Sequence, residues 1–185
     1  MFLFTVSIRF DSRLSSSVSS LFTSHTAFSN LSSVLLVWST PVQDPALPTT
    51  ISISALVNHD VEPVYDSCSL VALKAGDQRE VLWTIDGEGN QVPVSEAITY
   101  SPGEYVGDSD NEIRIAWHVV SDGLYSDEDC LHPSRGALQL DNISVSVTNG
   151  DSVTEIYDDF EDGSLGHWLP EVEPDTCITC FCCQE

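Results

Sequence analysis

The chain has 185 residues, and its six Lys and Arg residues stand against 29 Asp and Glu residues, for a formal net charge of −23. The length suits one domain with a sizeable core and terminal extensions. A charge of this sign repels phosphate backbones and anionic membrane surfaces, so we expect neither nucleic-acid binding nor membrane insertion. The composition favours a solvated extracellular domain whose carboxylates are potential ligands for hard cations.

Residues 1–48 are rich in Ser and nearly neutral, and we expect them to be poorly ordered, or at most to add one strand at 34–38. The apolar start MFLFTVSIRF is broken by Arg9 and lacks the apolar core and cleavage site of a secretory signal. The apolar run at 34–38 is too short to span a bilayer. We interpret the chain as a fragment, or a mis-started reading frame, of a longer secreted protein.

Short alternating runs separated by turns follow this segment. In residues 49–57, apolar side chains at every second position predict a strand with one buried face. Similar runs predict strands at 68–73, 80–85, 91–98, 113–119, 138–147 and 153–157. Pro93 places the run 91–98 at a sheet edge. Without helical periodicity, the pattern predicts an all-β fold, an antiparallel two-sheet β-sandwich over residues 49–157.

The run 138–147 changes phase in its middle. Leu138 and Leu140 share one parity, whereas the apolar residues from Ile143 onward share the other. One register cannot bury both sets, so a β-bulge is predicted at Asp141-Asn142. The alternative is a strand that is apolar on both faces. A bulge would re-aim the side chain of Asp141.

The phrase SDGLYSDED followed by GALQLDNISV, within residues 121–147, resembles the C-terminal half of jelly-roll modules of secreted bacterial proteins. These are the MAM-like and choice-of-anchor domains, some of them attached to metallopeptidases of the immune inhibitor A type. The resemblance covers roughly residues 52–147 and implies a jelly-roll, galactose-binding-like sandwich with a non-catalytic role. DDFEDGSLGHW resembles the opening of another such module, so residues 158–185 are expected to be a tail that begins a truncated second unit.

Three acidic loops, at 60–66, 108–112 and 122–129, are candidates for a structural Ca2+ site, because Ca2+ takes six to eight oxygen ligands. The alternative is a solvated acidic rim, and the EF-hand pattern is absent. Related jelly-roll modules often bind calcium near an Asp of the final strand, which makes Asp141 the first candidate. The candidate metal ligands are Asp141, Glu62, Asp66, Asp122, Asp127 and Asp129.

Tyrosines in or beside loops are candidates for stacking on a sugar ring, namely Tyr65, Tyr105 and Tyr125. Trp83 and Trp117 are in phase with apolar neighbours and are expected in the core. The histidines are scattered, with neither HExxH nor GxSxG, so we predict no enzyme activity and no catalytic residue. The cysteines crowded at the C-terminus allow local disulfides, a zinc site or no function.

Together these observations predict a non-catalytic binding or adhesion module of a secreted or cell-surface protein. It would recognise a glycan or another extracellular protein, with calcium as a possible structural ion. One alternative is an accessory fragment of a secreted metallopeptidase whose catalytic part is absent from this chain. Another is a structural spacer between modules.

Overall fold

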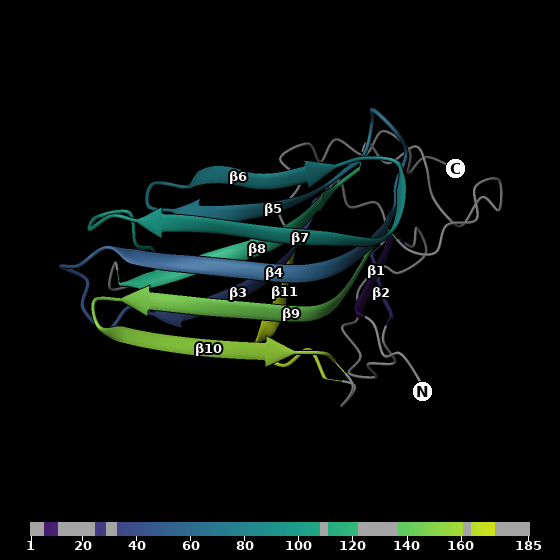
Figure 1. The fold of residues 1–185 in the computed structure, drawn as a ribbon. Helices are drawn as coiled ribbons and strands as arrows, with labels where there is room; N and C mark the ends of the chain where they lie inside the picture. Colours follow the sequence, from purple (N-terminus) through teal and green to yellow (C-terminus); the bar gives the residue numbers. More distant parts are fainter. Residues whose placement is uncertain are drawn as a thin grey trace.

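The computed structural model describes residues 6–10, 25–28, 33–107, 111–121, 137–160 and 164–172. In this part of the chain all regular structure is β, and two antiparallel sheets pack against each other as a β-sandwich (Figure 1). The all-β, two-sheet sandwich predicted from the alternating runs is confirmed. The described residues include no helix that is long and apolar enough to cross a membrane.

Sheet A has six strands, with β4 and β9 in its interior and β7 at one edge. On its far side β9 pairs with two strands: β1 pairs with its first residues, and β10 pairs with the rest. The sheet follows the order β7 (Glu88–Tyr100), β4 (Thr49–Asp60), β9 (Leu138–Asn149), β1 (Val6–Phe10) and β2 (His25–Phe28), which pairs parallel to β1. The sixth strand, β10 (Ser152–Asp158), pairs with β9 on the same side as β1.

Sheet B has five strands. In spatial order they are β6 (Gln78–Ile85), β5 (Ser67–Lys74), β8 (Glu112–Val120), β3 (Ser33–Pro41) and β11 (Trp168–Val172). From β3 to β11 the chain changes sheet at most connections, and only β5–β6 and β9–β10 are hairpins, which is the jelly-roll form of a sandwich. Pro93 and Pro170 lie in the edge strands β7 and β11, where a missing backbone N–H is tolerated.

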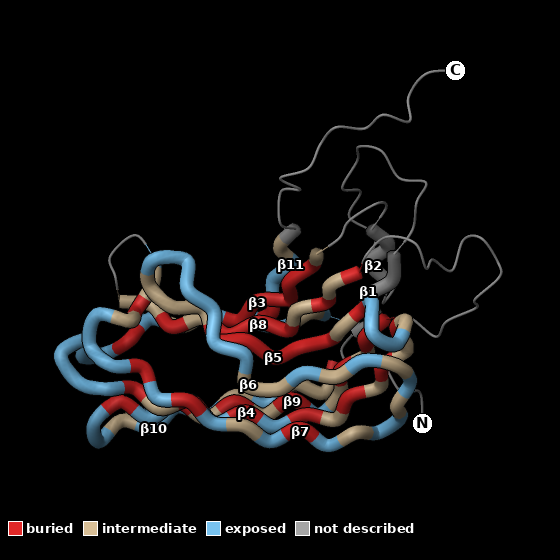
Figure 2. Tube along the Cα trace, turned by 90° about the horizontal axis from the view of Figure 1, so that it is seen from above, coloured by how far each residue is buried: buried red, intermediate tan, exposed pale blue. Residues whose placement is uncertain are grey.

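The core between the sheets is built around large aromatic side chains. Trp38, Trp117 and Trp168 are each at most 1% exposed, and Trp83 packs against the same cluster from β6. Figure 2 shows β4, β7 and β9 alternating between buried and more exposed positions, whereas β3, β5 and β8 are buried along most of their length. Sheet A therefore has one buried face, and the central strands of sheet B are buried on both.

The predicted bulge in β9 is confirmed. Ser54 of β4 pairs with Ser144, but Leu56 pairs with Asp141, so β9 has one more residue than β4 in this interval. Asn142 takes up the extra residue with a φ of 52°, a left-handed conformation that Asn tolerates. Because of the bulge, the apolar residues before it and those after it all face the core. These are Leu138 and Leu140 before the bulge, and Ile143 and Val145 after it.

The sandwich extends beyond residues 49–157 at both ends. Strand β3 is the single strand that the sequence allowed at 34–38, and it lies between β8 and β11 instead of in a poorly ordered segment. Residues expected to begin a second module include Phe160 and Trp168, which are 2% and 1% exposed in this core. They belong to the same sandwich because β11 pairs with β3 over five residues.

Candidate functional site

A groove of about 380 Å³ crosses the outer face of sheet B. Its volume falls within the range of small-ligand sites. All five strands of the sheet contribute to its lining, together with the loop between β7 and β8. The lining residues that the argument below uses are Leu35, Leu73, Lys74, Arg79, Arg114 and Glu171.

The base of the groove is apolar because sheet B carries a second, small hydrophobic cluster on its outer face. Leu35 and Val37 of β3 pack there with Val71 and Ala116, and all four are buried. Leu73 packs against them and lines the groove. The uninterrupted apolar run VLLVW of β3 accounts for this two-sided burial, as in strands that are covered on both faces. Of this cluster, Leu35 and Leu73 line the groove and give it apolar surface for the carbon face of a ligand.

Lys74, at the end of β5, lines the groove, and its ammonium is turned toward the inner side of sheet B. Its Nζ lies 2.8 Å from Glu80 Oε2 and 3.1 Å from Glu104 Oε1, and 5.8 Å from the centre of the Tyr100 ring. The hydrogen bond to Glu80 is the largest cause that raises the pKa of Lys74 above its usual value. A hydrogen bond from the backbone N–H of Ser101 and, secondly, the hydrogen bond from Lys74 lower the pKa of Glu104. Lys74 is thus a charged side chain held in a fixed position.

Arg114 of β8 forms an ion pair with Glu171 of β11, across the intervening strand β3. Arg114 lies opposite Ser39 and Glu171 lies opposite Leu35, so the two are offset by four residues along β3, or roughly 13 Å. Both side chains must lie along the sheet to meet, which places the pair over Val37. Their side chains are 28% and 43% exposed, so the ion pair borders the groove and remains in contact with solvent.

His118 lies on the same outer face, and its Nε2 is 2.7 Å from Ser33 Oγ. Burial, and secondly the charge of Arg79, lowers the pKa of His118 to about 4. Arg79 of β6 lies opposite Leu73 in the pairing with β5, so its side chain starts on this same face. Two arginines border the groove from different strands.

The residues described around two of the three acidic loops lie at opposite ends of the sandwich, and the loop at 122–129 lies outside the described residues. Glu62 and Asp66 lie in the connection from β4 to β5, at the end of the sandwich where β8 finishes. Gly107 and Asn111, which flank residues 108–110, lie at the opposite end, where β7 finishes and β8 begins. The expectation that all three loops face one another is therefore wrong for the loop at 108–112.

Asp141 is not brought together with Glu62 and Asp66. It lies on the outer face of sheet A opposite Leu56, and its Oδ1 accepts a 2.8 Å hydrogen bond from the N–H of Asn142. Four further residues, roughly 13 Å of strand, separate Leu56 from the end of β4. Within the described ranges no three His, Cys, Asp or Glu side chains are close enough to hold a metal. The candidates Asp122, Asp127 and Asp129 lie outside the described residues.

Asp66 itself is a buried carboxylate. It is 5% exposed, and its N–H donates a 3.0 Å hydrogen bond to the carbonyl of Glu62. Two residues further on, Cys68 is a free and fully buried thiol, and its Sγ donates to the carbonyl of Ala137 at 3.4 Å. Burial, and secondly the negative charge of Asp66, raises the pKa of Cys68 to about 12. The thiol is therefore protonated and unreactive at neutral pH.

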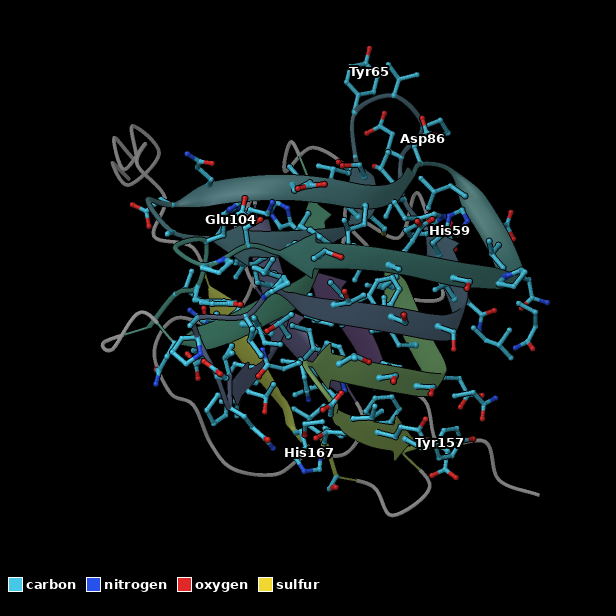
Figure 3. The ribbon with its side chains drawn as sticks, turned by 60° about the vertical axis from the view of Figure 1, so that its left-hand side comes forward. His59, Tyr65, Asp86, Glu104, Tyr157 and His167 are labelled. Carbon is cyan, nitrogen blue, oxygen red and sulfur yellow. The ribbon has the colours of Figure 1, made fainter. Side chains whose placement is uncertain are left out.

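The three candidate sugar-stacking tyrosines lie in different surroundings. Tyr65 is 64% exposed and stands clear of both sheets (Figure 3). Tyr105 is 1% exposed, its hydroxyl donates to the carbonyl of Leu47, and its ring stacks on Tyr100. A ring buried in this way cannot stack on a sugar, so the prediction for Tyr105 is wrong. Tyr125 lies outside the described residues.

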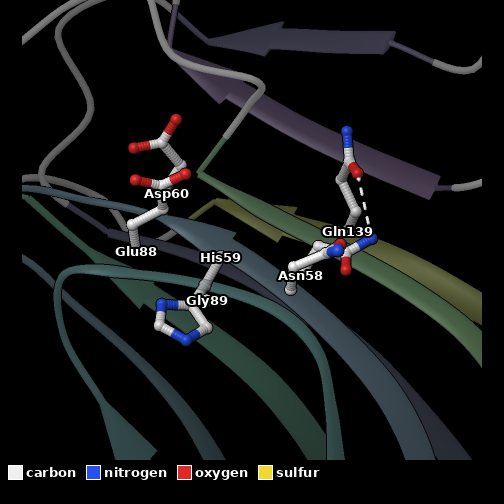
Figure 4. A pocket seen from close by; sticks show the side chains of 7 residues that line it. Asn58, His59, Asp60, Glu88, Gly89 and Gln139 are labelled. Atoms are coloured by element: carbon white, nitrogen blue, oxygen red, sulfur yellow. Dashed lines mark hydrogen bonds between the residues drawn. The ribbon is translucent and has the colours of Figure 1, made fainter.

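A smaller hollow of about 30 Å³, enough for one water molecule, lies where the end of β4 meets the start of β7 (Figure 4). Asp60 and Glu88 face each other across the two strands, on the side of β4 away from the His59 ring. His59 is 3% exposed, and its Nδ1 is 2.9 Å from the carbonyl of Gly87, which makes Nδ1 the donor. Its Nε2 has no partner among the described residues and faces Gly89. The ring is a structural part of this corner.

No protein-family model matches the chain, and no curated protein matches its sequence.

Reasoning from the sequence did not single out Lys74, Arg79 and Arg114 as site residues. They are three of only six Lys and Arg residues in the chain. In a chain with a net charge of −23, this scarcity was a usable signal, because each remaining cation is a candidate for a specific contact. The scarcity of Lys and Arg does not show which of them lie close together in the fold, because Arg114 and Lys74 belong to different strands.

Proposed function

We propose that this chain is a non-catalytic binding or adhesion module of a secreted or cell-surface protein. It recognises a glycan or another extracellular protein in the groove of sheet B. The observation that carries the proposal is the groove itself, with an apolar base and charged walls on a rigid sheet. Binding sites of this kind combine apolar contact with a few fixed polar groups.

The groove can be tested by filling it. Leu73→Trp places a large ring on its base, and Val153→Trp is the matched control, because Val153 is 59% exposed on β10 of the other sheet. We expect the wild-type chain to bind glycans or surface proteins in an array screen. Leu73→Trp should weaken that binding at least about tenfold, whereas Val153→Trp retains it. Equal binding by both variants would place the site elsewhere, and a wild-type chain that binds nothing would contradict the proposed function.

A structural Ca2+ ion near Asp66 is a second part of the proposal. Asp66 is buried at the end of the sandwich, next to Ser67, which pairs with Val120 of β8. In this antiparallel register Asp66 is beside Ser121, and the residues that follow Ser121 in the sequence include Asp122, Asp127 and Asp129. A cation that binds only the folded chain adds about 2.7 kcal/mol of stability at a concentration a hundred times its Kd. For a chain of this size the melting temperature then rises by roughly 5–10 °C.

The measurement is the melting temperature with millimolar Ca2+ and with EDTA. Asp66→Asn should remove most of the Ca2+-dependent difference, whereas Asp141→Asn should preserve it, because Asp141 lies on the outer face of sheet A. Mg2+ should have a smaller effect because it requires tight octahedral geometry. If NaCl at matched ionic strength reproduces the shift, the ion only screens an acidic surface and the site does not exist.

A further inference from the structure

The groove of sheet B brings together three of the chain's six Lys and Arg residues, namely Lys74, Arg79 and Arg114. Its lining also includes two acids, and two further carboxylates pair with Lys74. Attraction of a negatively charged ligand therefore rests on the guanidinium groups, which bind carboxylates with parallel N–H donors.

Arg114 is the cation whose partner is most easily exchanged. Lys74 is held by both Glu80 and Glu104, with its side chain only 13% exposed. Arg114 instead pairs with Glu171, which is 43% exposed on the edge strand β11. Solvent-exposed ion pairs of this kind contribute little to stability. Replacement of the Glu171 carboxylate by a ligand carboxylate therefore costs little and keeps the guanidinium paired.

Arginine is well suited to this exchange. The planar guanidinium presents parallel N–H donors that match the two oxygens of a carboxylate. Arg79 lies opposite Leu73 on the same face and adds a second guanidinium to the lining of the groove. Between these charges, Leu35 and Leu73 provide apolar contact.

We propose that the groove binds an oligosaccharide that contains uronic acid, with the sugar carboxylate on Arg114 in place of Glu171. This inference rests on the proposed function, since it names the ligand class of the same groove. Exchange of one carboxylate for another leaves the charge on Arg114 neutralised throughout.

The remaining lining distinguishes an acidic sugar from an acidic peptide. Asp77 and Glu171 are acceptors, which hydrogen-bond to sugar hydroxyls but repel a run of acidic side chains. Each internal sugar of a 1,4-linked uronic-acid oligosaccharide carries two free hydroxyls beside its carboxylate, and these donors match the two acids of the lining, whereas a Glu side chain has none.

The test is calorimetric titration of the full chain with short oligogalacturonates and oligomannuronates. The matched neutral galacto- and manno-oligosaccharides and an oligoglutamate peptide are titrated in parallel. We expect binding of the uronic-acid oligosaccharides that weakens at higher salt, and Arg114→Gln should lower their affinity at least about tenfold through loss of a charge-assisted contact. Glu171→Gln should raise the affinity because it removes the competing carboxylate. Glu155→Gln, on the outer face of sheet A, makes the same charge change away from the groove and should leave the affinity nearly unchanged.

The outcomes separate this inference from the proposed function. Equal affinity for neutral and acidic sugars, or no effect of Arg114→Gln in a variant with native melting behaviour, overturns the acidic ligand class and leaves a glycan-binding groove. Binding of the oligoglutamate alone also overturns the inference and favours a protein partner. If no probe binds here and the array screen finds no ligand, both the inference and the proposed function fail.

Discussion

Trp168→Ala should lower the free energy of unfolding by about 3–5 kcal/mol, the usual cost of truncating a buried Trp. Trp168 is 1% exposed and belongs to the core cluster that also contains Trp38 and Phe160. Its strand, β11, forms one edge of sheet B, and β3 is its only partner among the described strands. The loss therefore removes contacts from the main core and from the attachment of this edge strand. Urea unfolding followed by tryptophan fluorescence and circular dichroism measures the change.

Leu169→Ala is the matched control for this measurement. Leu169 is the next residue of the same strand, but it is 64% exposed. Its truncation should change the free energy of unfolding by about 0.5 kcal/mol or less. If Trp168→Ala has an equally small effect, β11 is not part of the folded sandwich, and residues 158–172 are the start of a separate unit, as the sequence analysis expected.

The alternation of apolar and polar residues was sufficient to predict the strands that have one buried face. In β4, apolar residues from Ile51 to Val57 alternate with polar ones, and the structure buries the apolar set. The phase change in β9 was sufficient to predict the bulge at Asp141-Asn142, because Leu140 and Ile143 cannot both face the core in one regular strand. In both strands a local, two-residue period carried the information.

Two strands lack this period: β3, which the sequence analysis allowed only as an option at 34–38, and β11, which it did not predict. β3 is buried on both faces, so its run VLLVW does not alternate, and its length alone cannot distinguish a strand from a buried patch. β11 has only five residues and contains Pro170, and a proline within a short run argues against a strand when the sequence alone is considered. Pairing with β3, more than a hundred residues earlier in the chain, determines its place, and no local pattern contains that information.

The groove was beyond local prediction for the same reason. Arg114 and Glu171 are 57 residues apart in the chain and meet only because β8 and β11 both pair with β3. Tyr105 shows the opposite error, since a tyrosine in a Gly-rich loop appeared exposed from its sequence context. In the structure, its hydroxyl donates to the carbonyl of Leu47, and this contact holds the ring inside the sandwich. The exposure of a side chain at a strand end depends on which loop covers it, and local sequence does not show this.

Gly89→Ala should destabilise the fold by about 3 kcal/mol, near the upper end of the range for overpacking a core. Gly89 lies opposite His59 in the pairing of β4 with β7. An added Cβ would be 2.2 Å from His59 Nε2 and 2.9 Å from both Cδ2 and Cε1. The ring cannot easily move away, because it is 3% exposed and hydrogen-bonded through Nδ1 to the carbonyl of Gly87. Thermal and urea unfolding of the single variant measure the cost.

A double-mutant cycle with His59→Ala tests the cause of this effect. His59→Ala removes the ring that the new methyl group would meet, so Gly89→Ala should cost little when it is added to that variant. The coupling between the two substitutions should be about 2 kcal/mol or more, in the range of residues in direct contact. Gly89 does not have a positive φ, so Ala at this position causes no backbone strain. The cost of Gly89→Ala should therefore depend on whether the His59 ring is present. An equal cost of Gly89→Ala with and without the His59 ring would show that the ring does not occupy this space.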